Sequence, residues 1–379
     1  MNMTHPTLDD KLYDLGNGRK LSMRDLLDYF AQMGRLRVSD LHIKAGVPPV
    51  YRVDGQLQKM KGPPLTRESV ELLARSLLTE HEWPRLVEGR STDGSCMTDT
   101  MQFRLNFFHE NEGLAIAIRA LESSAPAVEE IGFPNNVWRD IVARQHGLVL
   151  VTGITGAGKS TTIASLIDRI AQTRPCRIIT LEDPIEYRLH SKAAIISQRE
   201  VGRDVPSFER GLRDCLREDP DVIFVGEMRD RESAAWTLTA AETGHLVFST
   251  LHTRDTRGTL TRVLDMFPPN KQDEIASQLS LGLSHVISQK LIPRAKGEGR
   301  IVAMEIMNNI YACSNLIRQC KVEQIYSQLQ TRTKDVPEER MTTLERSLAN
   351  LVRAGHITPL EAEKWANNPS AFLEEMQRV

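Results

Sequence analysis

Residues 153–160 read Gly-Ile-Thr-Gly-Ala-Gly-Lys-Ser and match the pattern G-x-x-x-x-G-K-S/T at every fixed position. The run 148–151 is apolar throughout, and apolar residues recur at helical spacing over 161–171. The motif is therefore expected in a turn between a buried strand and a helix. A glycine-rich turn in that position lets backbone N–H groups face phosphate oxygens, and the helix N-terminus adds partial positive charge. This predicts an α/β fold with a phosphate site at one edge of a sheet.

Each position of the motif has a part in the predicted chemistry. The Lys159 ammonium is expected to reach the β- and γ-phosphates of ATP, and the Ser160 hydroxyl is expected to face Mg²⁺. The alternative is a glycine-rich turn without a ligand, but a chance match is expected on the order of once in a hundred chains of this length. The predicted ATP-binding residues are Gly153, Ile154, Thr155, Gly156, Ala157, Gly158, Lys159, Ser160 and Thr161.

Length, charge and cysteine content restrict the remaining possibilities. The chain has 379 residues, too many for one compact core and suited to two domains. Its 48 basic and 50 acidic residues nearly balance, which argues against nucleic acid as a partner. The N-terminus lacks the apolar segment of a signal peptide and no apolar run approaches about 18 residues, so we expect a cytoplasmic protein. The five cysteines include no C-x-x-C pair, so neither a zinc knuckle nor a redox pair is expected.

Residues 1–121 are predicted to form a small α+β domain. The pattern predicts strands within 50–57, 101–108 and 114–121, turns at 54–55 and 110–113, a helix opened by Ser22 and a helix at 66–78. Such segments build an antiparallel sheet with helices packed on it. Residues 122–130 lack periodicity and contain Pro and Ser, which predicts a linker, and 131–379 form the second domain.

Apolar strands alternate with helices in the second domain. The strands expected after 148–151 are 177–181, 222–225 and 246–250. This alternation predicts a parallel sheet that binds its nucleotide at the carboxyl ends of the strands.

Two acidic groups directly follow predicted strands of the second domain. Residues 182–186, Glu-Asp-Pro-Ile-Glu, come after one strand, where a carboxylate could orient or deprotonate an attacking water; the alternative is a solvated loop. Gly226 and Glu227 come after the next strand. Nucleotide-hydrolysing proteins usually place an Asp just before such a Glu to hold the Mg²⁺ shell, so Glu227 is expected to act on the metal through water.

Two histidines and two arginines are the remaining candidate site residues. His245 and His252 flank the strand 246–250. Each of the two has either a structural role or a role in contacting phosphate. Arg104 and Arg119 fall on paired strands of the first domain. They are either surface arginines or charge sensors that engage ATP when the domains close.

Five segments follow one another in order: GITGAGKST, LEDPIEY, SQREVGRD, LREDPDVIFVGEMRD and TAAETGHLVFSTLHT. They resemble the Walker A, Asp box, Walker B and His box motifs of the secretion ATPase superfamily, and within it the PilT-type retraction ATPases of type IV pili. SDLHIKAGVPPVYRVDGQL is similar to the PAS-like N-terminal domain of that family. The resemblance covers residues 20–360.

The resemblance implies a RecA-like motor domain and a cytoplasmic homo-hexamer in which each ATP lies between the two domains and a neighbouring subunit. It implies a peripheral position at the inner membrane, where the motor acts through the platform protein of the pilus machine and draws pilin back into the membrane. Carried over position by position, the catalytic glutamate falls on Glu186 and the Walker B glutamate on Glu227. The box histidines fall on His245 and His252, and the small-domain arginines on Arg104 and Arg119.

The chain departs from the family pattern at three places. Ile154 stands where Pro or Ala is frequent, the basic stretch after the Asp box is diluted at 190–194, and the C-terminal motif AIRNLIRE reads ACSNLIRQ at 312–319. That motif is associated with retraction rather than hydrolysis, so two hypotheses stay open. One is a retraction motor, which the lack of a four-cysteine zinc motif favours. The other is an accessory or regulatory ATP-binding member of the pilus or secretion motor; a DNA-handling ATPase is a third, disfavoured by the even charge.

Overall fold

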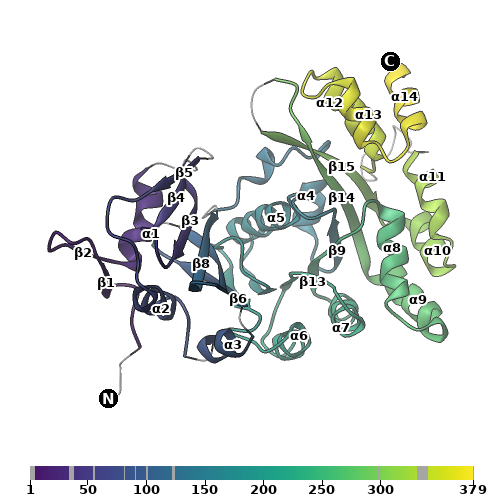
Figure 1. Ribbon diagram of the computed structural model, residues 1–379. Coiled ribbons are helices and arrows are strands. Elements are labelled where there is room, and N and C mark those ends of the chain that lie inside the picture. The colour runs from purple at the N-terminus through teal and green to yellow at the C-terminus, as the bar shows by residue number, and fades with distance from the viewer. Residues whose placement is uncertain are drawn as a thin grey trace. The chain divides into compact units, whose positions relative to one another are not determined.

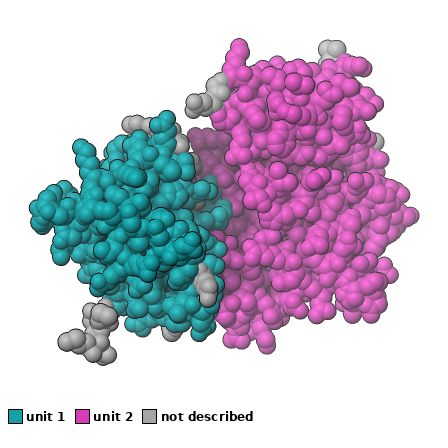
Figure 2. Space-filling model, viewed as in Figure 1, with its two compact units in different colours: residues 1–124, 186–188 teal, residues 125–185, 189–379 magenta. Residues whose placement is uncertain are grey.

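The computed structural model describes residues 5–33, 38–53, 56–80, 82–89, 91–99, 101–121, 124–296, 299–330 and 340–378. The chain divides into two compact units, which Figure 2 shows in different colours. The first unit comprises 1–124 together with 186–188, and the second comprises 125–185 and 189–379.

The first unit is built on a six-stranded antiparallel sheet with the strand order β5-β4-β3-β8-β7-β6 (Figure 1). Its helices and strands are β1 Lys11–Asp14, β2 Lys20–Ser22, α1 Met23–Gln32, β3 Val38–Lys44, β4 Val50–Val53, β5 Gln56–Lys59, α2 Arg67–Arg75, α3 Glu82–Gly89, β6 Ser91–Met97, β7 Gln102–Glu110 and β8 Gly113–Leu121. Ser22 caps α1 as predicted, because its hydroxyl accepts from the backbone N–H of Asp25 and the Asp25 carboxylate accepts from the backbone N–H of Ser22.

Some local expectations for the first unit need correction. The helix predicted at 66–78 ends at Arg75, and β6 was not predicted, since Ser91–Met97 shows little apolar alternation. The turn predicted at 54–55 lies outside the described residues. The turn at 110–113 does join β7 to β8 in a hairpin, with Glu110 paired to Gly113.

The second unit is built on a seven-stranded sheet with the order β11-β10-β12-β13-β9-β14-β15. Its helices and strands are η1 Val128–Glu130, α4 Val137–Ala143, β9 Gly147–Thr152, α5 Lys159–Thr173, β10 Arg177–Glu182, β11 Ile195–Glu200, α6 Phe208–Cys215, β12 Val222–Val225, α7 Arg231–Glu242, β13 Leu246–Leu251, α8 Thr256–Asp265, η2 Pro269–Lys271, α9 Gln272–Gly282, β14 Leu283–Pro293, β15 Arg300–Asn308, α10 Tyr311–Arg318, η3 Val322–Gln324, α11 Ile325–Gln330, α12 Leu344–Arg353, α13 Pro359–Trp365 and α14 Pro369–Gln377. The strands from β11 to β14 pair in parallel and β15 pairs antiparallel to β14, so the predicted α/β fold with a mostly parallel sheet is confirmed.

Strand register decides which loops share an edge of this sheet. β9 and β13 pair from Gly147 with Leu246 to Thr152 with Leu251, and β12 ends beside β13 with Val225 opposite Ser249. The loops that follow β9, β10, β12 and β13 therefore leave at the same edge. β15 runs the other way and ends at Asn308, opposite His285 near the start of β14, so α10 begins at the opposite edge.

The segment 122–130, predicted as a linker, is partly structured. Residues 128–130 form η1, which packs against α5, and Val128 is 2% exposed. Residues 122 and 123 lie outside the described residues, and the first unit ends at Ser124. The apolar Val128 explains why this segment packs instead of remaining a free connection.

Glu305 is a buried acid in the second sheet and links folding to pH. It lies on β15, is 2% exposed, and its Oε1 accepts from the Thr256 N–H at 2.7 Å. Burial raises the pKa of Glu305 from an ordinary value of 4.5 to about 7. The folded protein thus holds this proton to a higher pH than the unfolded chain does, and stability falls as pH rises from about 4.5 to about 7.

Glu305→Gln should therefore stabilise the protein more at pH 8 than at pH 5. A pKa unit corresponds to about 1.4 kcal/mol, so the gain at pH 8 should be up to about 3 kcal/mol, while near pH 5 the two proteins should be similar. Urea unfolding at both pH values measures the difference, with the exposed Glu274→Gln as the control. An equal effect at the two pH values would contradict the assignment.

Candidate functional site

The loop 153–158 between β9 and α5, called the P loop below, depends on glycine at three positions. Gly153, Gly156 and Gly158 have φ values of +150°, +77° and +85°, which side-chain-bearing residues rarely adopt. A Cβ on Gly153 would lie 2.5 Å from the Gln289 carbonyl oxygen, whereas nothing lies within 4 Å of a Cβ on Gly156. The loop is therefore packed on one side and open on the other. This open, glycine-lined turn at the start of α5 fits a phosphate group.

Lys159, the first residue of α5, turns back over the P loop. The residue is 9% exposed, and its Nζ donates to the Gly153 carbonyl oxygen at 3.0 Å and lies 3.5 Å from His252 Nδ1. A buried ammonium needs such acceptors because it has lost most of its water. The contact with His252 brings the carboxyl ends of β9 and β13 together through side chains.

A chain of polar contacts continues from His252 across the strand ends. His252 Nε2 lies 3.3 Å from Glu227 Oε1, and Arg229 Nε donates to Glu227 Oε2 at 2.7 Å. Arg229 Nη1 then donates to Asp183 Oδ2 at 3.1 Å. We call the five residues of this chain of contacts the strand-end cluster: Lys159, His252, Glu227, Arg229 and Asp183. The ion pair with Glu227 raises the pKa of Arg229, so the cluster keeps a fixed positive charge beside its carboxylates.

The alignment of four parallel strands produces the strand-end cluster. Asp183 follows β10, Glu227 follows β12, His252 follows β13 and the P loop follows β9. The Thr250 hydroxyl donates to the Gly226 carbonyl oxygen at 2.6 Å, which holds the loop after β12 against β13. The sequence predicted that these segments meet, and here they do.

Gly226 has a structural reason for being glycine. A Cβ there would lie 3.1 Å from the Leu181 carbonyl oxygen and 3.3 Å from Glu182 Cα, both backbone atoms of β10. The backbone leaves no comfortable room for a side chain, so an Asp before Glu227 would force β10 and β12 apart.

Oxygen donors suited to Mg²⁺ are present at the P loop. Ser160 lies in the first turn of α5 and Glu227 carries a carboxylate, and hydroxyl and carboxylate oxygens are the ligands Mg²⁺ takes alongside phosphates. The part of the chain that the structure describes contains no group of three or more His, Cys, Asp or Glu side chains placed to hold a metal ion. One hydroxyl and one carboxylate fit a metal that takes its other ligands from phosphate and water.

His245 is not brought to the strand-end cluster. It precedes β13, whereas His252 follows this strand, and six residues of strand separate the two ends by about 20 Å. His245 Nδ1 instead lies 3.0 Å from the Ala240 carbonyl oxygen near the end of α7. Nδ1 also lies 3.0 Å from the Thr243 hydroxyl, so these contacts tie the end of the helix to the start of the strand. A contact of His245 with phosphate stays a prediction.

Glu186, Arg104 and Arg119 belong by their contacts to the first unit. Arg104 and Arg119 are opposite each other on β7 and β8, so the prediction that they sit side by side on paired strands is confirmed. Arg104 Nη2 donates to Glu186 Oε1 at 3.2 Å, and Arg119 Nε donates to Asp40 Oδ1 at 2.8 Å. Their catalytic roles stay predictions.

Sequence reasoning missed Arg229 and Gln289, and it named Asp183 only as a member of the acidic group 182–186. The positions of Asp183 and Arg229 just after strands could have suggested that the two form a pair. Gln289, against which the P loop packs, is a lone glutamine outside every motif, and no local signal marks it.

Comparison with known proteins places the chain in a family. The model for the family described as Type II/IV secretion system protein matches residues 23–355. The chain belongs to this family. The resemblance predicted from the five ordered segments is thereby confirmed.

Individual relatives in this family match over nearly the whole chain. A type IV pilus retraction ATPase, PilT, of Pseudomonas aeruginosa is 42% identical over 353 residues, which is 93% of this chain and 100% of the relative. A twitching motility protein of Neisseria gonorrhoeae is 39% identical over 350 residues, 90% of this chain and 92% of the relative. A crystal structure of the pilus retraction motor PilT with bound ADP is 41% identical with a TM-score of 0.84, and covers 94% of this chain and 100% of that one.

None of the helices within the described residues is long and apolar enough to cross a membrane.

Gly226→Ala should destabilise the second unit, because the new methyl group would press on the backbone of β10. Overpacking of this kind costs about 1–3 kcal/mol. Thermal unfolding measures the loss. The matched control is Gly282→Ala at the end of α9, where a Cβ would meet only Ala241 Cβ at 3.7 Å. A melting temperature for Gly226→Ala as high as that of the control would refute the steric explanation.

Proposed function

We propose that this protein is a hexameric ATPase motor that powers retraction of type IV pili. The observation that carries the proposal is the strand-end cluster: Lys159 contacts His252, and His252 contacts Glu227. A cation and a carboxylate, two groups that phosphoryl transfer uses, are thereby joined through the imidazole of His252.

Each residue has a distinct task in hydrolysis. The P-loop N–H groups and Lys159 would bind the β- and γ-phosphates. Ser160, and Glu227 through water, would hold Mg²⁺, which would neutralise negative charge on the phosphates. His252 lies between Lys159 and Glu227 and can report the presence of the γ-phosphate to the loop after β12. Glu186 is proposed to orient or deprotonate the water, and Arg104 and Arg119 to sense phosphate charge.

The partners follow from the family. The relative from P. aeruginosa is described as a pilus retraction ATPase and the one from N. gonorrhoeae as a twitching motility protein, and both match more than nine-tenths of their own length. We infer that this chain assembles into a homo-hexamer at the cytoplasmic face of the inner membrane. There it would act on the platform protein of the pilus machine and, through it, on pilin.

An accessory role in a pilus or secretion motor remains the second candidate because of the altered segment 312–319. This segment forms α10 and the residue after it, and α10 starts at the sheet edge opposite the P loop. The Ser314 hydroxyl donates to the Ser280 carbonyl oxygen of α9 at 2.8 Å, which joins α10 to α9. Gln319 Nε2 donates to Asn315 Oδ1 at 3.2 Å within the segment itself. A change here can alter the use of ATP energy without altering hydrolysis.

Lys159→Ala and Glu227→Gln should separate binding from chemistry. Lys159→Ala should lose both ATP binding and turnover, because the phosphate charge is left without its cation. Glu227→Gln should bind ATP within about threefold of wild type while kcat falls by about 10². Turnover and equilibrium binding of ATP measure the two effects, and the exposed Lys271→Ala serves as the control. A folded Lys159→Ala hexamer with normal turnover would overturn the proposed site.

Ser314→Arg combined with Gln319→Glu should change motility and spare hydrolysis. The two substitutions restore the charges of the family motif at the edge away from the P loop, so ATP turnover should change less than about threefold, which is about 0.65 kcal/mol in barrier. Twitching and pilus retraction speed in cells should change. Ser314→Ala, which removes the hydrogen bond and adds no charge, is the control. Lost turnover with unchanged motility would contradict this separation.

A further inference from the structure

Gln289 is a buried polar residue that directly contacts the P loop. It lies on β14, is 2% exposed, and its amide is bonded at both ends. Nε2 donates to the Ala157 carbonyl oxygen at 2.6 Å, and Oε1 accepts from the Thr162 hydroxyl at 2.9 Å. One side chain thus joins the end of the P loop to the first turn of α5.

The backbone of the P loop is fitted to the same residue. The Gln289 carbonyl oxygen excludes any side chain at Gly153, and Gln289 Nε2 would lie 3.2 Å from a Cβ on Gly158. The two glycines at the ends of the loop therefore both face Gln289. The loop is shaped by this residue as much as by its own sequence.

Only a neutral amide satisfies both partners of this side chain. The Ala157 carbonyl oxygen requires a donor and the Thr162 hydroxyl, as placed, an acceptor. An ionised glutamate accepts only, and would set a carboxylate against the carbonyl oxygen, while an aliphatic residue leaves both partners unpaired in a buried place.

The residue after Gln289 connects β14 to the C-terminal helices. Successive side chains of a strand point to opposite faces of the sheet, so the Lys290 side chain leaves the face opposite to the Gln289 side chain. Lys290 lines one cavity together with Gly153 and Ile154 of the P loop and with the end of α13. Its Nζ donates to the Trp365 carbonyl oxygen at 2.7 Å and to Asn367 Oδ1 at 2.6 Å, at the end of α13. A displacement of the C-terminal end of α13 would therefore pull on β14, the strand that contacts the P loop.

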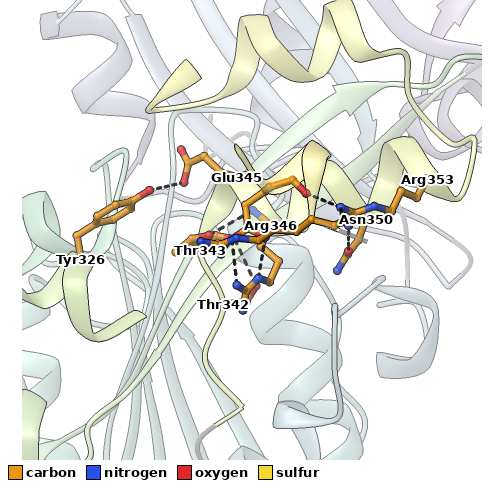
Figure 3. A network of polar contacts seen from close by, with 9 residues as sticks. Tyr326, Thr342, Thr343, Glu345, Arg346, Asn350 and Arg353 are labelled. Atoms are coloured by element: carbon orange, nitrogen blue, oxygen red, sulfur yellow. Dashed lines mark hydrogen bonds and ion pairs between the residues drawn. The ribbon is translucent and has the colours of Figure 1, made fainter. Parts of the chain in front are cut away.

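The end of α13 is itself held by the buried carboxylate of Glu345 on α12. Glu345 Oε1 accepts from the backbone N–H groups of Asn367 and Asn368 at 3.1 and 3.0 Å. The Tyr326 hydroxyl, which lies across from Glu345 in Figure 3, donates to Oε2 at 3.1 Å. The C-terminal helices thus present a fixed, hydrogen-bonded support to Lys290.

We propose that Gln289 is a positioning residue of the ATP site, and that Lys290 ties it to the C-terminal helices. Gln289 would hold the P loop in its phosphate-binding shape without touching the nucleotide. This inference rests on the proposed function only in taking the P loop as the site for nucleotide phosphates.

The test measures the Kd of the full-length protein for MgADP by calorimetry, together with the melting temperature. Gln289→Leu should raise Kd at least about tenfold, the usual scale for unpairing buried hydrogen-bonding groups, and the isosteric Gln289→Glu should also raise it. Lys290→Met should raise Kd about threefold, since it removes only the outer support. The matched control is Ser347→Ala, which deletes another buried hydrogen bond of the second unit, the one Ser347 accepts from the Met304 N–H. It should lower the melting temperature and leave Kd unchanged.

A double-mutant cycle separates positioning from general destabilisation. Thr162→Val and Gln289→Leu break the same contact, so the double variant should bind MgADP less weakly than the product of the single effects predicts. Wild-type affinity in a folded Gln289→Leu or Gln289→Glu would overturn the positioning role, and Gln289→Glu decides the matter if Gln289→Leu fails to fold. Wild-type affinity in Lys290→Met would overturn the link to the C-terminal helices. Failure of the wild-type protein to bind MgADP would instead reject the proposed function.

Discussion

Parallel pairing of β9, β10, β12 and β13 is the constraint on which the candidate site depends. Because these strands run the same way and are in register, every loop that carries a functional group leaves at one edge of the sheet. β9, β12 and β13 carry no charged side chain, so the charged groups of the site lie in the loops that follow these strands or in the helix after them. The groups that sequence motifs scatter over about a hundred residues are therefore collected within hydrogen-bonding distance.

Close backbone approach is the second requirement, and it explains the glycines that lack a chemical role. Gly153 lets the P loop rest on β14, and Gly226 lets the loop after β12 lie against β10. In each case a side chain would separate two strands or loops that must stay close for the cluster to form. The glycine in place of the usual Asp before Glu227 is thus a consequence of packing.

The strand-end cluster balances its charges internally. Arg229 pairs with the carboxylates of Glu227 and Asp183, and His252 lies between Glu227 and the Lys159 ammonium. Such a network is sensitive to any added charge, because every member shares a partner with the next. A phosphate that approached Lys159 would compete with His252 for the ammonium and so reach Glu227 indirectly. This gives the predicted His box a physical meaning for His252, whereas His245 secures the end of α7.

The sequence by itself determined the P loop, the strands that lead into the site, Glu227, His252 and the α/β fold, because each depends on local patterns: glycines at fixed spacing, apolar runs and polar residues at their ends. It did not reveal β14, whose centre carries Ser288, Gln289 and Lys290, or β11, whose alternation is masked by charged residues. It could not separate His245 from His252, since both flank the same strand. Only the tertiary structure decided that Gln289 braces the P loop and that Arg229 pairs with Asp183. The contact of Gln289 with the P loop joins residues that are 132 positions apart in the sequence, and the contact of Arg229 with Asp183 joins residues that are 46 positions apart. No local propensity encodes contacts over such separations.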